Sequence, residues 1–233
     1  MIVSIHQPHF LPWLGYFNKV FHSDVFVWLH NVQYRKNYFQ NRTKIKNPFE
    51  DKETWLTVPV KASLSDSIDQ VKIADATWVN KAIKTIDQFY RRAPYFDRYF
   101  EKLINTFDES ADLDGINYKT FSFLLKELEY PGKVVRVEDI QVTTLDPNDR
   151  LIEICQKLGS DHYIAGKGGK NYLEMEKWNM AGIKISWQAF NPEVLQYEQL
   201  GKIFVPALSI IDCLFNIGPE QTRERVVGAW KPE

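Results

Sequence analysis

Two histidines and an amide side chain lie close together near the start of the chain, at His6, Gln7 and His9. They follow the short apolar run 2–5, and the prolines among them cannot continue a strand or the interior of a helix. An imidazole near neutral pH can transfer a proton or stabilise a developing negative charge. We therefore predict His6 and His9 as catalytic residues, with Gln7 as a substrate ligand.

A structural interpretation of the same stretch stays open. In it, the prolines and aromatic residues close the end of the core, and the histidines make only local hydrogen bonds. A metal site is disfavoured, because the His-x-x-His spacing supplies two ligands and no Cys, Asp or Glu lies close in sequence. We predict no metal ligands.

A segment rich in glycine and lysine, 166–171, is the second candidate loop. It follows the predicted strand 162–165, and its glycines permit tight backbone conformations while its lysines supply positive charge for an anion. The spacing matches neither the common ATP-binding loop nor the dinucleotide fingerprint, so an ordinary glycine turn is the alternative. The predicted ligands are Gly166, Lys167, Gly168, Gly169, Lys170 and Tyr172.

Between positions 33 and 46 the chain is dense in aromatic, amide and cationic residues. Cationic groups bind phosphate, and aromatic faces cover a sugar or a base, so this mixture favours a phosphorylated or carbohydrate ligand. The alternative is an exposed polar hairpin. We predict substrate contacts from Gln33, Asn41 and Arg42, and from Trp13, Tyr16 and Lys19 nearer the start of the chain.

The apolar pattern places both candidate loops after strands. Strands alternate with helices at both ends of the chain, and a mostly helical insertion occupies about 75–130. We predict a single α/β domain over 1–233, with a mainly parallel sheet in a three-layer sandwich and both loops at its carboxyl edge. The expected strands are 2–5, 25–29, 133–137, 162–165 and 183–187, and the expected helices around them are 15–21, 149–158, 172–180 and a closing helix from 208 that ends near 216–218.

Composition narrows the function classes. Lys and Arg total 29 against 30 Asp and Glu, a formal charge of −1, which disfavours nucleic acid as a partner. No apolar stretch is long enough for a membrane span and no signal peptide is visible, so we expect a cytoplasmic protein. The two cysteines, Cys155 and Cys213, are expected in the core. The sequence specifies neither a cofactor nor an oligomeric state.

Several separated motifs together resemble the WbqC-like protein family. They are His6-Gln7-Pro8, Pro12 to Phe17 with Lys19, Asp24 to Val27, Val32-Gln33-Tyr34, Asn41-Arg42, Trp55 to Val60, Tyr163 to Gly166 with Gly168-Gly169 and Tyr172-Leu173, and Ser209 to Asp212 with Asn216-Ile217-Gly218. The family is associated with bacterial surface-polysaccharide gene clusters.

The resemblance implies an enzyme of surface-polysaccharide (O-antigen-type) or related biosynthesis, a transferase that acts by group transfer on a nucleotide-linked or phosphorylated sugar. The alternative is a non-catalytic module that binds a glycan or a partner of the pathway. The chain departs from the family at His30, where an acidic residue is usual.

Overall fold

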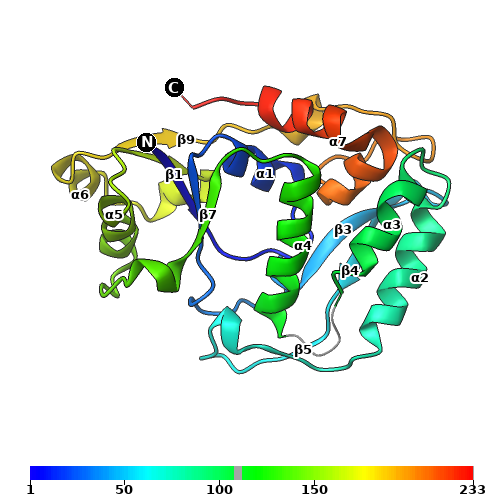
Figure 1. The fold of residues 1–233 in the computed structure, drawn as a ribbon, viewed down its shortest axis with the longest axis horizontal. Coiled ribbons are helices and arrows are strands. Elements are labelled where there is room, and N and C mark those ends of the chain that lie inside the picture. Colours follow the sequence, from blue (N-terminus) through cyan, green and yellow to red (C-terminus); the bar gives the residue numbers. More distant parts are fainter. Residues whose placement is uncertain (108–111, 233) are drawn as a thin grey trace.

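The structure, a computed structural model, describes residues 1–107 and 112–232. Its centre is a parallel sheet of five strands in the order β7, β2, β1, β8, β9 (Figure 1). The predicted α/β fold and its parallel sheet are therefore confirmed. The strands are β1 (Ile2–His6), β2 (Val25–Trp28), β7 (Lys133–Arg136), β8 (His162–Ala165) and β9 (Lys184–Trp187).

Strand β2 is buried on both faces, as strands of parallel sheets usually are. Val25 and Val27 point into an apolar cluster with α5 and α6, whereas Phe26 and Trp28 point into a second cluster with α1, α4 and α7. Helices thus pack against both faces of the sheet. These helices are α1 (Leu14–Phe21), α4 (Leu113–Glu127), α5 (Pro147–Lys157), α6 (Met175–Met180) and α7 (Ile210–Gly228).

The order of the strands creates a crevice at one edge of the sheet. From β1 the chain passes through α1 to β2 on one side, and it returns later through α5 to β8 on the other side. β1 pairs directly with both β2 and β8 in parallel register. Loops that leave β1 and β8 at their carboxyl ends diverge, which is where open α/β sheets bind ligands.

A long excursion separates β2 from β7. Its described residues form two antiparallel strand pairs and three α-helices, and Figure 1 shows α2 and α3 at the end of the molecule opposite α5 and α6. Within the predicted insertion at about 75–130, positions 108–111 lie outside the described residues. The elements not yet bounded are β3 (Arg42–Asn47), β4 (Lys52–Thr57), β5 (Val60–Lys61), β6 (Lys72–Ile73), α2 (Trp78–Tyr90) and α3 (Phe96–Ile104).

Two predicted helices differ from the structure. The segment 167–171 forms a short 3-10 turn, and regular helix begins only at Met175. The closing helix does not end near 216–218: Gly218 has φ 76°, which breaks the helical path, and helix resumes to Gly228. Both cysteines are buried, as expected. In the described part of the chain, no helix has the length and apolar character that crossing a membrane requires.

Candidate functional site

A cavity of about 1240 Å³ opens at the carboxyl edge of the sheet, where β1 and β8 diverge. His6 and Gln7 line it from the end of β1, and Lys167 and Gly168 line it from the loop after β8. The two candidate loops therefore face one cavity. Helix α1, which begins directly after the first loop, contributes further lining residues.

The hydrogen bonds of His6 define its tautomer. Its Nδ1 lies 2.9 Å from the carbonyl oxygen of Gln7, which also accepts a hydrogen bond of 3.1 Å from the hydroxyl of Tyr16. Because a carbonyl oxygen only accepts, Nδ1 of the neutral ring holds the hydrogen and Nε2 holds the lone pair. Burial, together with Lys19 and His9, lowers the pKa of His6 well below 6.5. The ring is therefore neutral at pH 7.

His9 lies deeper, with 4% of its surface exposed, and lines the same cavity. Its ring centroid is 4.8 Å from that of His6, 5.1 Å from Tyr16 and 5.7 Å from Phe39. Both ring nitrogens are buried and have no hydrogen-bond partner among the described residues. Burial, with the positive charge of Lys19, lowers its pKa to about 3. A neutral imidazole with both nitrogens unpartnered is costly to bury unless a ligand or water contacts it.

Lys19 is the third basic group of this part of the cavity. It lies on α1 with 3% of its surface exposed, and its Nζ donates a 2.9 Å hydrogen bond to the carbonyl oxygen of Ile5. Burial lowers its pKa from 10.5 to about 7. Among the described residues no carboxylate forms an ion pair with Lys19. We call His6, His9 and Lys19 the basic cluster.

The cavity lining is strongly biased in charge, although the chain as a whole is close to neutral. Among the described residues, no Asp or Glu lines it. Aromatic side chains supply much of the remaining wall. The Lys and Arg residues of the lining are Lys19, Arg35, Lys44, Arg150 and Lys167, and the aromatic residues are Trp13, Tyr16, Tyr38, Phe39, Tyr163, Tyr172 and Phe190.

Comparison with known proteins assigns the chain to a family. The model of the WbqC-like protein family matches residues 7–224. The chain belongs to the WbqC-like protein family. The chain is also 26% identical over 222 residues to an uncharacterized protein of Mycobacterium tuberculosis, Rv1507c, with 94% of each chain covered. No solved structure matches the chain significantly.

In this WbqC-like protein, most of the residues predicted from sequence lie around the cavity. The exceptions are Asn41, Arg42 and Lys170, which do not line it. Arg42 donates to the carbonyl oxygen of Asn37, and its guanidinium lies 4.1 Å from the ring centroid of Trp55. The residues that do line it are His6, Gln7, His9, Trp13, Tyr16, Lys19, Gln33, Gly166, Lys167, Gly168, Gly169 and Tyr172.

The two other exceptions have structural contacts. Asn41 is buried and donates a 2.9 Å hydrogen bond to the carbonyl oxygen of Val58. Lys170 is exposed, with its Nζ 5.7 Å from the ring centroid of Trp187. These residues hold the hairpin and the loop rather than the cavity wall.

Arg150 in α5 and Gln188 after β9 line the cavity but had no signal in the sequence, because they lie far apart along the chain and outside any recognisable motif. Arg35, which also lines it, belongs to the segment 33–46 but was not among the predicted ligands. Arg150 donates a 2.5 Å hydrogen bond to the side chain of Asn31, and its Nε is buried without a partner. Gln188 donates 2.7 Å and 2.8 Å hydrogen bonds that attach the end of β9 to α1.

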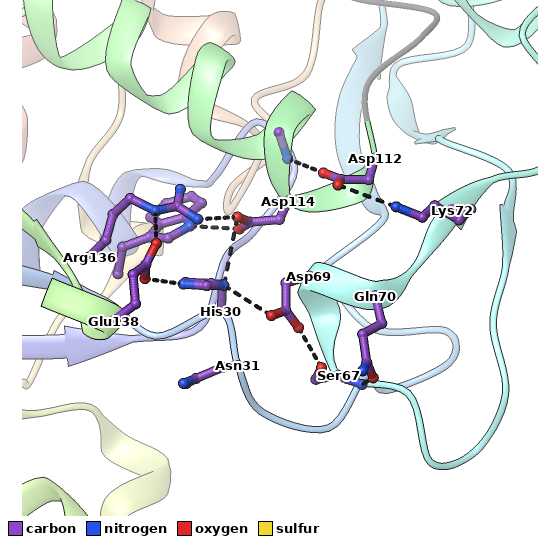
Figure 2. A network of polar contacts seen from close by, with 12 residues as sticks. His30, Asn31, Ser67, Asp69, Gln70, Lys72, Asp112, Asp114, Arg136 and Glu138 are labelled. Atoms are coloured by element: carbon purple, nitrogen blue, oxygen red, sulfur yellow. Dashed lines mark hydrogen bonds and ion pairs between the residues drawn. The ribbon is translucent and has the colours of Figure 1, made fainter. Parts of the chain in front are cut away.

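His30 does not line the cavity but lies, itself buried, in a network of polar contacts beside its wall (Figure 2). Its Nε2 contacts the carboxylate of Glu138, and its Nδ1 is 3.6 Å from Asp69 and 3.8 Å from Asp114. Arg136 donates to Asp114 at 2.8 Å and to Glu138 at 2.6 Å. The imidazole thus lies among carboxylates from three separate elements, just before the lining segment 31–33.

This network corresponds to no metal site. Among the described residues, no group of three or more His, Cys, Asp or Glu side chains has an arrangement suited to a metal ion. His30 places an imidazole ring between the carboxylates of Asp69 and Glu138. The contacts of His30 connect the chain just before the lining segment 31–33 to Asp69 and Glu138.

Proposed function

We propose that this protein binds a nucleotide-linked or phosphorylated sugar in the cavity and catalyses group transfer in bacterial surface-polysaccharide or related biosynthesis. The supporting observation is the composition of the lining, which combines five Lys or Arg residues with seven aromatic residues and, among the described residues, no carboxylate. Membership of the WbqC-like family supports the biosynthetic context.

The chemistry of such a ligand matches the lining. Phosphate oxygens accept hydrogen bonds from lysine and arginine, and sugar or base rings pack on aromatic faces. The volume of about 1240 Å³ exceeds the upper end of about 1,000 Å³ typical of drug-sized ligands. A ligand of the size of a nucleotide sugar therefore fits better than a simple sugar phosphate.

The geometry of His6 gives it a role in transfer. Its unprotonated Nε2 can accept the proton of an acceptor hydroxyl as the hydroxyl oxygen forms the new bond. The bond to the leaving phosphate then breaks, and Lys167 and Arg35 bind the negative charge that the phosphate acquires.

A binding module without catalysis is the second candidate. It is favoured by one observation: the described lining has no carboxylate to act as a general acid, and burial keeps both histidines neutral. In this case the protein holds a glycan intermediate for a partner enzyme. Ligand affinity without turnover by the purified protein distinguishes this candidate from the enzyme.

The first experiment is a thermal-shift screen against nucleotide sugars, sugar phosphates, nucleotides and acyl-CoA compounds, each with and without Mg²⁺. A ligand of the folded state at a hundred times its Kd adds about 2.7 kcal/mol to stability, a clear rise in Tm. Any ligand found is then tested for turnover. If no phosphorylated or nucleotide-linked sugar stabilises the protein, the proposed function is wrong.

Matched lysine variants locate the site. Lys167→Ala removes a cavity charge, whereas Lys184→Ala removes an exposed charge from the start of β9, at the opposite edge of the sheet. We expect Lys167→Ala to weaken ligand binding about tenfold, about 1.4 kcal/mol, and Lys184→Ala to leave it unchanged. Equal effects of the two variants would contradict the assignment of the ligand to this cavity.

A further inference from the structure

We propose that His9 and Lys19 of the basic cluster bind one anionic oxygen group of the ligand, a phosphate or a carboxylate, and that Lys19 takes up a proton together with the anion. The inference deepens the proposed function, on which it rests for the identity of the cavity as the ligand site. It specifies where the charged group of the ligand lies and that its binding requires the uptake of a proton.

His9 supplies the first argument. Its side chain is buried and lines the cavity, and neither ring nitrogen has a hydrogen-bond partner in the described part of the chain. The surrounding rings of His6, Tyr16, Tyr38 and Phe39 fix it in place. Buried polar side chains normally have hydrogen-bond partners, so an imidazole without one at the wall of a cavity is best explained by a hydrogen bond to the ligand.

The tautomer of His6 supplies the second argument. Nδ1 donates to the carbonyl oxygen of Gln7, so Nε2 of the neutral ring presents a lone pair. An anionic oxygen has only lone pairs to offer and is repelled by that nitrogen. The anion therefore lies at His9 and Lys19, and Nε2 of His6 keeps the lone pair that accepts a proton in group transfer.

Lys19 completes the cluster. One N–H of its Nζ is used by the carbonyl oxygen of Ile5. The amine is close to half protonated at pH 7, because burial lowers its pKa to about 7. An anion nearby favours the charged form and draws a proton from solution, by the same linkage that joins any ligand to a titrating group.

The other groups around the cluster do not supply the missing charge. The hydroxyl of Tyr16, on α1, donates to Gln7, and burial raises the pKa of this hydroxyl well above 10, so it stays neutral. Tyr38 faces His9 from the loop after β2, and Asp114 on α4 pairs with Arg136. At pH 7 without a ligand, both histidines are uncharged and Lys19 is close to half protonated, which limits the repulsion among the three groups.

The test uses sulfate and acetate, because neither ion titrates between pH 7 and 8.5. Affinities are measured by calorimetry at constant ionic strength across this range. Uptake of one proton makes affinity fall up to about tenfold for each pH unit above the pKa of free Lys19, about 7. A pH-dependent affinity for sulfate identifies phosphate-like anions as ligands, and one for acetate identifies carboxylates.

Two variants separate the contributions. Lys19→Arg keeps a charge that does not titrate, so it should bind the anion with an affinity that is flat from pH 7 to 8.5. His9→Phe keeps an aromatic ring against Tyr16 and Phe39 but removes both ring nitrogens. We expect this variant to fold and to bind the anion about tenfold more weakly. Lys184→Met is the control for general surface charge and should behave as wild type.

The proposal is wrong if the wild-type affinities for both ions are independent of pH, or if Lys19→Arg retains the wild-type pH dependence. Its failure can be distinguished from that of the proposed function. A nucleotide sugar that binds in the cavity with pH-independent affinity refutes only the proton-linked cluster. Proton-linked sulfate binding in a protein that binds no sugar phosphate or nucleotide sugar refutes only the proposed function.

Discussion

Replacing Lys19 by methionine should stabilise the protein although it removes a residue of the site. Lys19 is 3% exposed, and burial lowers its pKa from the ordinary value of 10.5 to about 7. At 1.36 kcal/mol for each pKa unit, burying Lys19 lowers the free energy of unfolding by about 5 kcal/mol well below pH 7. At pH 7 it lowers this free energy by about 4 kcal/mol. Loss of the hydrogen bond to Ile5 offsets about 1 kcal/mol.

The sign of the pH dependence follows from the lowered pKa. Between pH 7 and 10.5 the unfolded chain binds more protons at Lys19 than the folded protein, so this residue makes stability rise with pH. Its unfavourable contribution falls from about 4 kcal/mol at pH 7 to about 1 kcal/mol at pH 9.5. The stability advantage of Lys19→Met should shrink by about 3 kcal/mol over the same range.

Urea denaturation of both proteins at pH 7 and pH 9.5 measures this effect directly. Lys46→Met is the matched control, because Lys46 is equally buried but lies 3.5 Å from Asp51 and donates to the carbonyl oxygen of Ile203. Removing that paired charge should destabilise the protein by about 2 kcal/mol. If Lys19→Met is less stable than wild type at pH 7, the description of Lys19 as an unpaired buried base is wrong.

Three further predictions concern other parts of the structure. Asp212 accepts 2.8 Å hydrogen bonds from Tyr90 and Tyr197, and burial raises its pKa from 3.8 to about 6. Its favourable contribution to the free energy of unfolding is therefore complete below pH 3.8 and is lost as pH rises through about 6. Urea denaturation should show wild type losing about 2 kcal/mol relative to Asp212→Asn between pH 4.5 and 7. His30→Asn should cost about 1 kcal/mol in the same assay through the lost hydrogen bond to Glu138. His30→Asp should cost more, because it places a fourth carboxylate among the existing three. Gly168→Ala should leave the Tm unchanged, because an added Cβ meets no atom within 4 Å, but it should weaken ligand binding in calorimetry, because this position lines the cavity. Gly169→Ala should lower the Tm, because its Cβ would lie 3.1 Å from the ring of Trp187.

The strands and the two candidate loops could be predicted because their signals are local. The run 162–165 was predicted with the bounds that β8 has in the structure, and the prolines after β1 correctly indicated where the chain leaves the sheet. The meeting of the two loops followed from the rule that parallel strands end at one edge. The end of α7 could not be found in this way, since a glycine break with helix on both sides resembles a helix end.

The remaining site residues depend on the tertiary structure. Arg42 and Lys44 lie two positions apart on β3 and both lie near the ring of Trp55, yet only Lys44 lines the cavity, whereas Arg42 donates to the carbonyl oxygen of Asn37. Residue type alone also predicted histidines able to titrate near pH 7. Their neutrality results from burial beside Lys19, which no local pattern reveals.

The net charge of the chain and the charge of the cavity lining lead to different conclusions about anionic ligands. A net charge of −1 argues against broad electrostatic attraction of a polyanion, because that depends on the field outside the molecule. A small anion inside the cavity instead interacts with Lys19, Arg35 and Lys167 at short range and with little screening by solvent. Keeping unpaired basic groups inside a folded protein lowers its stability, and this cost is concentrated in the cavity at the edge of the sheet. That distribution is expected where binding a ligand, rather than folding, determines which residues are present.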